Sequence, residues 1–274
     1  MRIISLSSIP PRFAKLAPTL KSLVDQIGPI NEIRLYIPKR YRRFPEYDGS
    51  LPAVPDGITI VRPDDDMGPA SKVLFATREF RGKDAQILFC DDDKVFEPDW
   101  ASRLFLAQKE RPNECVALIG KDVPKAFATS TPFLPRAVRK RKLTLALRAR
   151  RLHYKVATKV FGAEVRRPMP TLIERGGYAD IFQGLGGVVV RPEFFGDLAY
   201  DIPNVLWTVD DYWLSGMLAV KGIAIYLPAG LAEPFSTGAH EVSSLYRATI
   251  EGANRAEANR RCIEYLQEHF GIWR

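Results

Sequence analysis

Three consecutive aspartates, Asp91 to Asp93, are the residues whose type and spacing point most directly to chemistry. They follow the apolar run 86–90 (QILFC), which is typical of a strand covered on both faces. Open α/β sheets bind their ligands at the carboxyl ends of such strands, and adjacent carboxylates repel one another unless a cation lies among them. Oxygen ligands favour Mg²⁺ or Mn²⁺, ions that hold diphosphates through one or two carboxylates. The alternative is a solvated acidic loop that caps the next helix.

A second candidate is the segment 64–72 (DDDMGPASK). Pro69 suits the first turn of a helix, and a helix start there directs free backbone N–H groups toward a phosphate, with Lys72 in the first turn. The acidic residues just before it, Asp66 among them, could accept hydrogen bonds from a base or a ribose. The alternative is an ordinary helix start with acidic capping residues.

A third candidate is the pair Asp210 and Asp211, which opens a helix. Either carboxylate could take the proton from an attacking hydroxyl, although carboxylates are common at helix N-termini because they suit the dipole. The three histidines are far apart and form no zinc pattern. His240, in a loop with Ser, Thr and Gly, could complete an aspartate-based metal site; a lone loop histidine is more often structural.

The elements that must position these residues alternate along the chain. Apolar runs predict strands at 2–6, 33–37, 58–61, 86–90, 184–190 and 223–227. Helical spacing and stop signals predict helices at 16–27, 69–80, 99–107, 210–222 and 254–269. This alternation predicts an α/β fold with a mostly parallel sheet flanked by helices.

The positive charge is concentrated in one segment. Residues 136–167 hold twelve Lys or Arg and one acidic residue, or +11, whereas the rest of the chain carries −3 of the +8 total. Within it, an apolar helical stripe is edged by basic side chains: Leu145, Ala149, Leu152, Val156 and Val160, with Arg148, Arg151, Lys155 and Lys159. Such a helix could rest on an anionic membrane surface, cover the protein's own core, or meet a phosphate-bearing acceptor. Nucleic acid is not expected, since aromatics are few and no recognition module is present.

Composition indicates the class of protein and the cellular compartment in which it works. Apolar residues make up 46% and charged residues 26%, as in ordinary globular proteins. The three cysteines are scattered, which favours a reducing compartment, and no apolar run has the length of a membrane span. Two prolines follow the first short apolar stretch, unlike a signal peptide. We expect a cytoplasmic protein, with peripheral association to the inner membrane left open.

Together these stretches resemble bacterial glycosyltransferases of the GT-A fold, close to the family-two-like group. The stretches that carry the resemblance are 5–13 (SLSSIPPRF), 35–45 (LYIPKRYRRFP), 66–72 (DMGPASK), 88–100 (LFCDDDKVFEPDW), 184–195 (GLGGVVVRPEFF) and 208–222 (TVDDYWLSGMLAVKG). The departure is 121–175, which is longer and more basic than the family needs. The resemblance implies a single domain over 1–274, with a nucleotide-sugar half at 1–120, a basic insertion at 121–175 and an acceptor half at 176–274.

The resemblance also implies residue roles. Asp91 and Asp93 look like the outer members of the family's DxD motif, which holds Mn²⁺ or Mg²⁺ against the donor diphosphate, with Asp92 between them at the nucleotide. His240 lies where some relatives supply a further metal ligand, and Asp211, or its neighbour Asp210, looks like the general base. The remaining residues implied at the nucleotide are Ser7, Ile9, Pro10, Arg12, Asp66 and Lys72.

The implied reaction moves a sugar from a nucleotide-sugar donor, a UDP-sugar in the family's usual form, to a glycan or lipid-linked acceptor in bacterial surface polysaccharide or lipopolysaccharide synthesis, with inversion. Two alternatives stay open. The string Asp91 to Val95 also satisfies the DxDx[TV] motif of haloacid-dehalogenase-like phosphotransferases, in which Asp91 would be a phosphorylated nucleophile and Asp210 and Asp211 the later acidic pair. A non-catalytic module that binds membrane or polyanion is the other.

Overall fold

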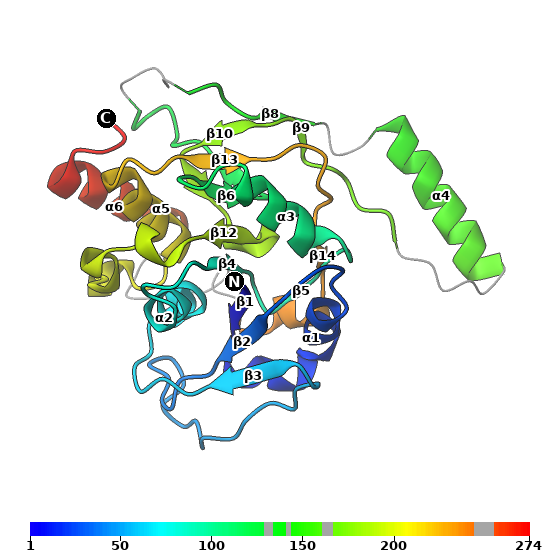
Figure 1. Ribbon diagram of the computed structural model, residues 1–274, viewed down its shortest axis with the longest axis horizontal. Helices are drawn as coiled ribbons and strands as arrows, with labels where there is room; N and C mark the ends of the chain where they lie inside the picture. Colours follow the sequence, from blue (N-terminus) through cyan, green and yellow to red (C-terminus); the bar gives the residue numbers. More distant parts are fainter. Residues whose placement is uncertain (129–133, 141–143, 161–166, 244–254) are drawn as a thin grey trace.

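A central eight-stranded sheet organises the computed structural model, which describes residues 1–128, 134–140, 144–160, 167–243 and 255–274 (Figure 1). The strands, in their order across the sheet, are β10 (Gly177–Ala179), β13 (Ile225–Leu227), β6 (Cys115–Ala117), β12 (Val188–Val190), β4 (Gln86–Phe89), β1 (Arg2–Ser7), β2 (Glu32–Tyr36) and β3 (Ile58–Val61). β3, β2, β1 and β4 are parallel, as are β6 and β13, whereas β12 and β10 run against their neighbours. The predicted α/β fold with a mostly parallel sheet is confirmed.

The sheet separates two hydrophobic cores, because successive strand residues point to opposite faces. Ile87 and Phe89 of β4 belong to one core, and Leu88 belongs to the other. Ile3 and Ile4 of β1 divide in the same way. All of these side chains are fully buried, so the continuous apolar runs in the sequence reflect strands covered on both sides.

Helices cover both faces. α2 (Ser71–Glu79), α5 (Asp210–Val220) and α6 (Arg255–Phe270) contribute buried residues to the core that contains Ile87. α1 (Ala17–Val24) and α3 (Trp100–Lys109) contribute to the opposite core. Short 3-10 turns connect these elements: Pro10–Lys15, Gly68–Ala70, Gly184–Gly186, Pro192–Phe194, Asp197–Tyr200, Asn204–Leu206 and Gly238–Glu241.

Three short ladders lie outside the main sheet. β11 (Ile181–Phe182) pairs with β7 (Gly120–Lys121), β14 (Phe235–Ser236) with β5 (Lys94–Val95), and β8 (Val138–Arg139) with β9 (Ile173–Arg175), all antiparallel. The β14–β5 ladder matters most for the site, because β5 follows the three aspartates directly. It brings the loop after β14 against the acidic loop.

The predicted strand over 184–190 is wrong in its first half. Only Val188–Val190 is a strand, and Gly184–Gly186 forms a 3-10 turn. Gly187 has a φ of +97°, and a Cβ there would lie 2.4 Å from the Trp100 ring. The glycines therefore serve a turn and a close packing contact, which an apolar run with leading glycines does not distinguish from a strand.

The basic segment contains helix α4 (Leu145–Val160), which lies at the periphery, away from the layers of the sheet (Figure 1). Parts of the segment, 141–143 and 161–166, lie outside the described residues, as does Asn254 at the predicted start of the last helix. Among the helices of the described ranges, none is both long and apolar enough to cross a membrane.

Candidate active site

A cavity of about 370 Å³ opens where β1 and β4 end, in the size range of small-ligand sites. Parallel pairing sets Ser5 opposite Phe89, so the residues after both strands reach the same edge of the sheet. Every residue implied at the site lines this cavity except Pro10, which starts the 3-10 turn Pro10–Lys15: Ser7, Ile9, Arg12, Asp66, Lys72, Asp91, Asp92, Asp93, Asp210, Asp211 and His240. The fold thus brings together segments from both halves of the chain.

Lys72 lies between two carboxylates of the cavity. Its Nζ is 2.6 Å from Asp91 Oδ1 and 3.0 Å from Asp210 Oδ2, and its side chain is 7% exposed. Burial alone would lower the pKa of Lys72, but Asp210 and Asp91 raise it well above its ordinary value. Burial opposes ionisation of Asp91 too, yet the adjacent Lys72 holds the pKa of that carboxyl below its ordinary value. The lysine is therefore a fixed positive charge inside the cavity.

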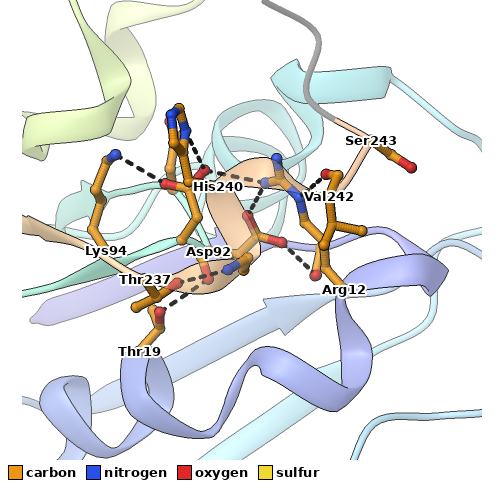
Figure 2. A network of polar contacts seen from close by, with 12 residues as sticks. Arg12, Thr19, Asp92, Lys94, Thr237, His240, Val242 and Ser243 are labelled. Carbon is orange, nitrogen blue, oxygen red and sulfur yellow. Dashed lines mark hydrogen bonds and ion pairs between the residues drawn. The ribbon is translucent and has the colours of Figure 1, made fainter.

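Asp92, the middle residue of the three, turns toward the β1 side of the site (Figure 2). Its Oδ1 accepts from Arg12 and its Oδ2 from the Ser8 hydroxyl, both at 2.5 Å, while its backbone oxygen accepts from the Thr19 hydroxyl at 2.9 Å. Burial raises the pKa of Asp92 despite these partners. Because both carboxylate oxygens are occupied, Asp92 holds the acidic loop against the first helices.

Asp93 faces the loop after β14. Its Oδ2 is 4.0 Å from His240 Nδ1 and 3.4 Å from Arg12, and its Oδ1 is 3.2 Å from Lys94 Nζ. Thr237 donates its backbone N–H to the Asp93 carbonyl at 2.9 Å, which fixes the histidine loop to the acidic loop. His240 is half exposed. It thus lies beside Asp93, one of the two aspartates with which it was expected to share a metal ion.

Asp211 also lines the cavity, in the first turn of α5. Its Oδ1 accepts a hydrogen bond from the backbone N–H of Gly184 at 3.0 Å. A Cβ on Gly184 would lie 3.1 Å from Lys72 Nζ and 3.2 Å from the same carboxylate oxygen, so a glycine is suited to this close approach. Burial, with the adjacent Asp210 carboxylate, raises the pKa of Asp211 to about 7. A carboxyl with that pKa can accept a proton near neutral pH.

Asp66, another residue that lines the cavity, is bonded to the backbone of two loops. Its two carboxylate oxygens accept the backbone N–H groups of Arg42, at 2.7 Å, and Gly68, at 2.8 Å. Burial raises the pKa of Asp66. Trp207 packs against this loop: a Cβ on Gly68, whose φ is +58°, would lie 2.7 Å from its ring. Since Asp66 already orders two loops, any ligand group would share its oxygens with the backbone.

Several residues that line the cavity were not predicted from the sequence. Tyr41 donates its hydroxyl to the Ser8 carbonyl at 2.8 Å, and Arg255 lies 3.9 Å from Asp210 Oδ1. Lys94 and Asn259 also line the cavity, and Asn259 Oδ1 is buried without a hydrogen-bond partner among the described residues. Lys94 adjoined the aspartates and could have been singled out; the α6 residues carry no local signal, because only the tertiary fold brings them to the site.

The donor set suits a divalent cation that a diphosphate completes, rather than a closed protein cage. Within the described ranges, no three or more His, Cys, Asp or Glu side chains converge to hold a metal alone. However, the buried Asp93 Oδ1 forms an ion pair with Lys94 Nζ at 3.2 Å but accepts no hydrogen bond from a described residue, and His240 lies beside the other oxygen. Ions such as Mg²⁺ bind diphosphates through one or two protein ligands. Asp93 and His240 fit that arrangement, while Asp91 is already engaged by Lys72.

Comparison with known proteins does not identify a family. No protein-family model and no curated protein matches the sequence. Among solved structures, residues 1–349 of S. aureus TarS in complex with UDP overlay with a TM-score of 0.45 at 16% identity, over 99% of this chain and 72% of that one. A longer S. aureus TarS structure gives 0.44 at 16% identity, over 100% of this chain and 44% of that one. Likenesses of this strength establish neither an activity nor a ligand.

Proposed function

We propose that the protein is a metal-dependent glycosyltransferase of the GT-A type that moves a sugar from a nucleotide-sugar donor, a UDP-sugar in the simplest form, to a glycan or lipid-linked acceptor. The observation that carries the proposal is the position of Asp211. This carboxyl, with a pKa of about 7, lines the same cavity as the acidic end of β4 and the fixed charge of Lys72. One cavity thus combines a proton acceptor with the lysine and the carboxylates that we expect to bind a diphosphate and its metal ion.

In the proposed reaction Asp211 takes the proton from the acceptor hydroxyl as that oxygen attacks the anomeric carbon, and the bond to the nucleoside diphosphate breaks. Its hydrogen bond from Gly184 fixes the carboxylate, so that Oδ2 is left to meet the acceptor. Lys72 places positive charge where the departing diphosphate gains negative charge. Mn²⁺ or Mg²⁺, held by Asp93 and His240 with Asp91 close by, would neutralise the same leaving group. A single displacement of this kind inverts the anomeric centre.

The other implied residues take supporting positions. Ser7, Ile9 and Arg12 follow β1 and line the cavity beside the acidic loop, where a nucleotide would lie. Asp66, beside Trp207, would face its base or ribose. We propose a cytoplasmic location and a role in bacterial surface polysaccharide or lipopolysaccharide assembly.

The experiment is a thermal-shift panel of nucleotide sugars with and without Mn²⁺, followed by detection of released nucleoside diphosphate. A ligand at a hundredfold excess over its Kd stabilises the chain by about 2.7 kcal/mol, which a melting scan resolves. Failure of every nucleotide sugar to bind, with trapping of a phosphoryl group on Asp91 from a phosphate ester, would favour the phosphotransferase alternative. Glycan binding that needs no divalent ion and survives Asp93→Ala would favour the non-catalytic module.

A further inference from the structure

Helix α4 contacts the rest of the protein through the face opposite its apolar stripe. Of its sixteen residues, Leu147 is the buried one, and Arg151 and Tyr154, on the same side of the helix, are partly buried. Arg151 donates its Nε–H to the Pro168 carbonyl at 3.3 Å. The sequence placed Arg151 along the edge of the apolar stripe; the structure places it on the inner face.

The apolar stripe faces outward. Leu145 is 82% exposed, Leu152 65%, Val156 42% and Val160 69%. A helix at the surface of a globular protein normally turns its apolar side toward the core. Here that side is left open, so the alternative in which this stripe covers the protein's own core is wrong for the described structure. Isolated exposed leucines are ordinary, but a continuous stripe along four turns requires a partner.

The charge beside the stripe indicates the nature of that partner. At 100° per residue, Arg148, Lys155 and Lys159 fall along one edge of the stripe and Arg150 on the other side, and the helix contains no acidic residue. A protein partner with a matching apolar groove would have to neutralise these cations individually. An anionic lipid surface supplies the required geometry directly, because phosphates lie in the plane just above the acyl chains.

We propose that this outer face of α4, namely Leu145, Ala149, Leu152, Val156 and Val160 with Arg148, Lys155 and Lys159, lies on an anionic lipid bilayer. The helix rests parallel to the surface, with the stripe at the boundary between headgroups and acyl chains and the cations among the phosphates. Long basic side chains can bury their stems beside the stripe and keep their charged ends in water.

Contacts beyond α4 connect this helix to the candidate active site. The Arg167 guanidinium lies over the Phe235 ring of β14, 5.9 Å from its centroid, and Glu233 donates its backbone N–H to the Pro170 carbonyl at 2.8 Å. β14 pairs with β5, and Thr237 after it bonds the Asp93 carbonyl. A bilayer contact at α4 would therefore tether the segment that leads to the Asp93 loop to the surface on which a lipid-linked acceptor of the proposed function lies.

The test is sedimentation of the full chain with vesicles of phosphatidylcholine alone and of phosphatidylcholine mixed with phosphatidylglycerol. We expect binding to the mixed vesicles and its loss as salt rises. Leu152→Gln with Val156→Gln should weaken binding at least about tenfold, since this pair supplies much of the exposed apolar area. Arg148→Gln with Lys155→Gln and Lys159→Gln should weaken it on the order of 100-fold, at about fivefold per cation.

Matched controls lie elsewhere on the surface. Leu198→Gln with Val205→Gln removes two exposed apolar side chains, and Lys21→Gln with Lys39→Gln and Arg81→Gln removes three exposed cations. These controls should bind vesicles like the wild type, and all variants should keep its melting temperature. Equal binding to neutral and anionic vesicles, no binding to either, or losses in the controls equal to those in the α4 variants would overturn the proposal.

A labelled cysteine reports the contact directly. The native cysteines Cys90, Cys115 and Cys262 are all buried, so a polarity-sensitive dye will react with Leu152→Cys selectively. Its emission should shift to the blue on anionic vesicles, whereas the same dye on Leu198→Cys should not respond. A blue shift without lipid, with a doubled sedimentation mass that the Gln variants return to a monomer, would instead assign the face to a second copy of the chain. None of these readouts needs substrate, so they stand or fall independently of the glycosyltransferase proposal.

Discussion

The backbone N–H of Gly184 lies 3.0 Å from Asp211 Oδ1, and so a glycine turn before β12 orients a carboxylate from the start of α5. We expect Asp211→Asn to lower kcat by about 10²- to 10⁴-fold, because an amide cannot accept the acceptor proton but can keep the hydrogen bond from Gly184. Steady-state release of nucleoside diphosphate measures this. Asp210→Asn is the matched neighbour: if it abolishes turnover while Asp211→Asn leaves turnover intact, the base is Asp210.

The pH dependence of kcat/KM should show one acidic limb. Burial raises the pKa of Asp211 from 3.8 to about 7, so the base is protonated and inactive below that value and active above it. We expect kcat/KM to fall about tenfold per pH unit below the apparent pKa, which belongs to the whole carboxylate cluster rather than to one residue. A flat profile from pH 5.5 to 8.5 would remove Asp211 from this role.

The same proton links pH to stability. Because the raised pKa lets the folded chain keep the Asp211 proton where the unfolded chain has released it, the free energy of unfolding attributable to this group falls as pH rises from about 4 to about 7. Asp211→Asn has no such proton and should melt above the wild type at pH 8, with the difference shrinking toward pH 5. Urea unfolding at both pH values tests the sign.

Lys72 should contribute strongly to folding as well as to binding. Lys72→Met leaves the buried carboxylate of Asp210 and the partly exposed carboxylate of Asp91 without the lysine between them, and breaking a buried pair such as Lys72 with Asp210 costs about 3–5 kcal/mol. Lys39→Met is the control, because its ion pair with Asp64 is exposed and such pairs contribute less than about 1 kcal/mol. Equal losses in urea unfolding would contradict the assigned burial. Adding Asp91→Asn to Lys72→Met should recover part of the stability.

Substitutions of Asp92 and Asp93 should have different effects: one should lower stability and the other should abolish metal binding. Asp92→Asn disturbs the contacts with Arg12 and Ser8 and should cost about 1–3 kcal/mol of stability while the extra thermal shift that Mn²⁺ gives to a nucleotide sugar remains. Asp93→Asn should abolish that Mn²⁺-dependent shift. The opposite pattern, with metal dependence lost only in Asp92→Asn, would move the cation to the middle carboxylate.

The sequence predicted six of the eight strands of the main sheet, most helices and the acidic end of β4, because buried parallel strands are apolar throughout and end abruptly in polar residues. It missed β6 and β10, which are three residues each. It could not separate the roles of the three aspartates. Asp91, Asp92 and Asp93 have the same side chain, and their different partners come from Lys72, Arg12 and His240, far away in the sequence. The sequence also could not predict which face of α4 contacts the protein, because periodicity identifies an apolar stripe but not the surface that it contacts.

β4 contributes side chains to both hydrophobic cores, and the three aspartates begin two residues after its end at Phe89. The backbone that carries the three carboxylates is therefore attached to a fully buried strand, and we expect the amide protons of β4 to exchange only on global unfolding. A ligand bound by these carboxylates should therefore raise the free energy of unfolding of the whole sheet. Occupancy of the site and resistance to proteolysis should accordingly rise together.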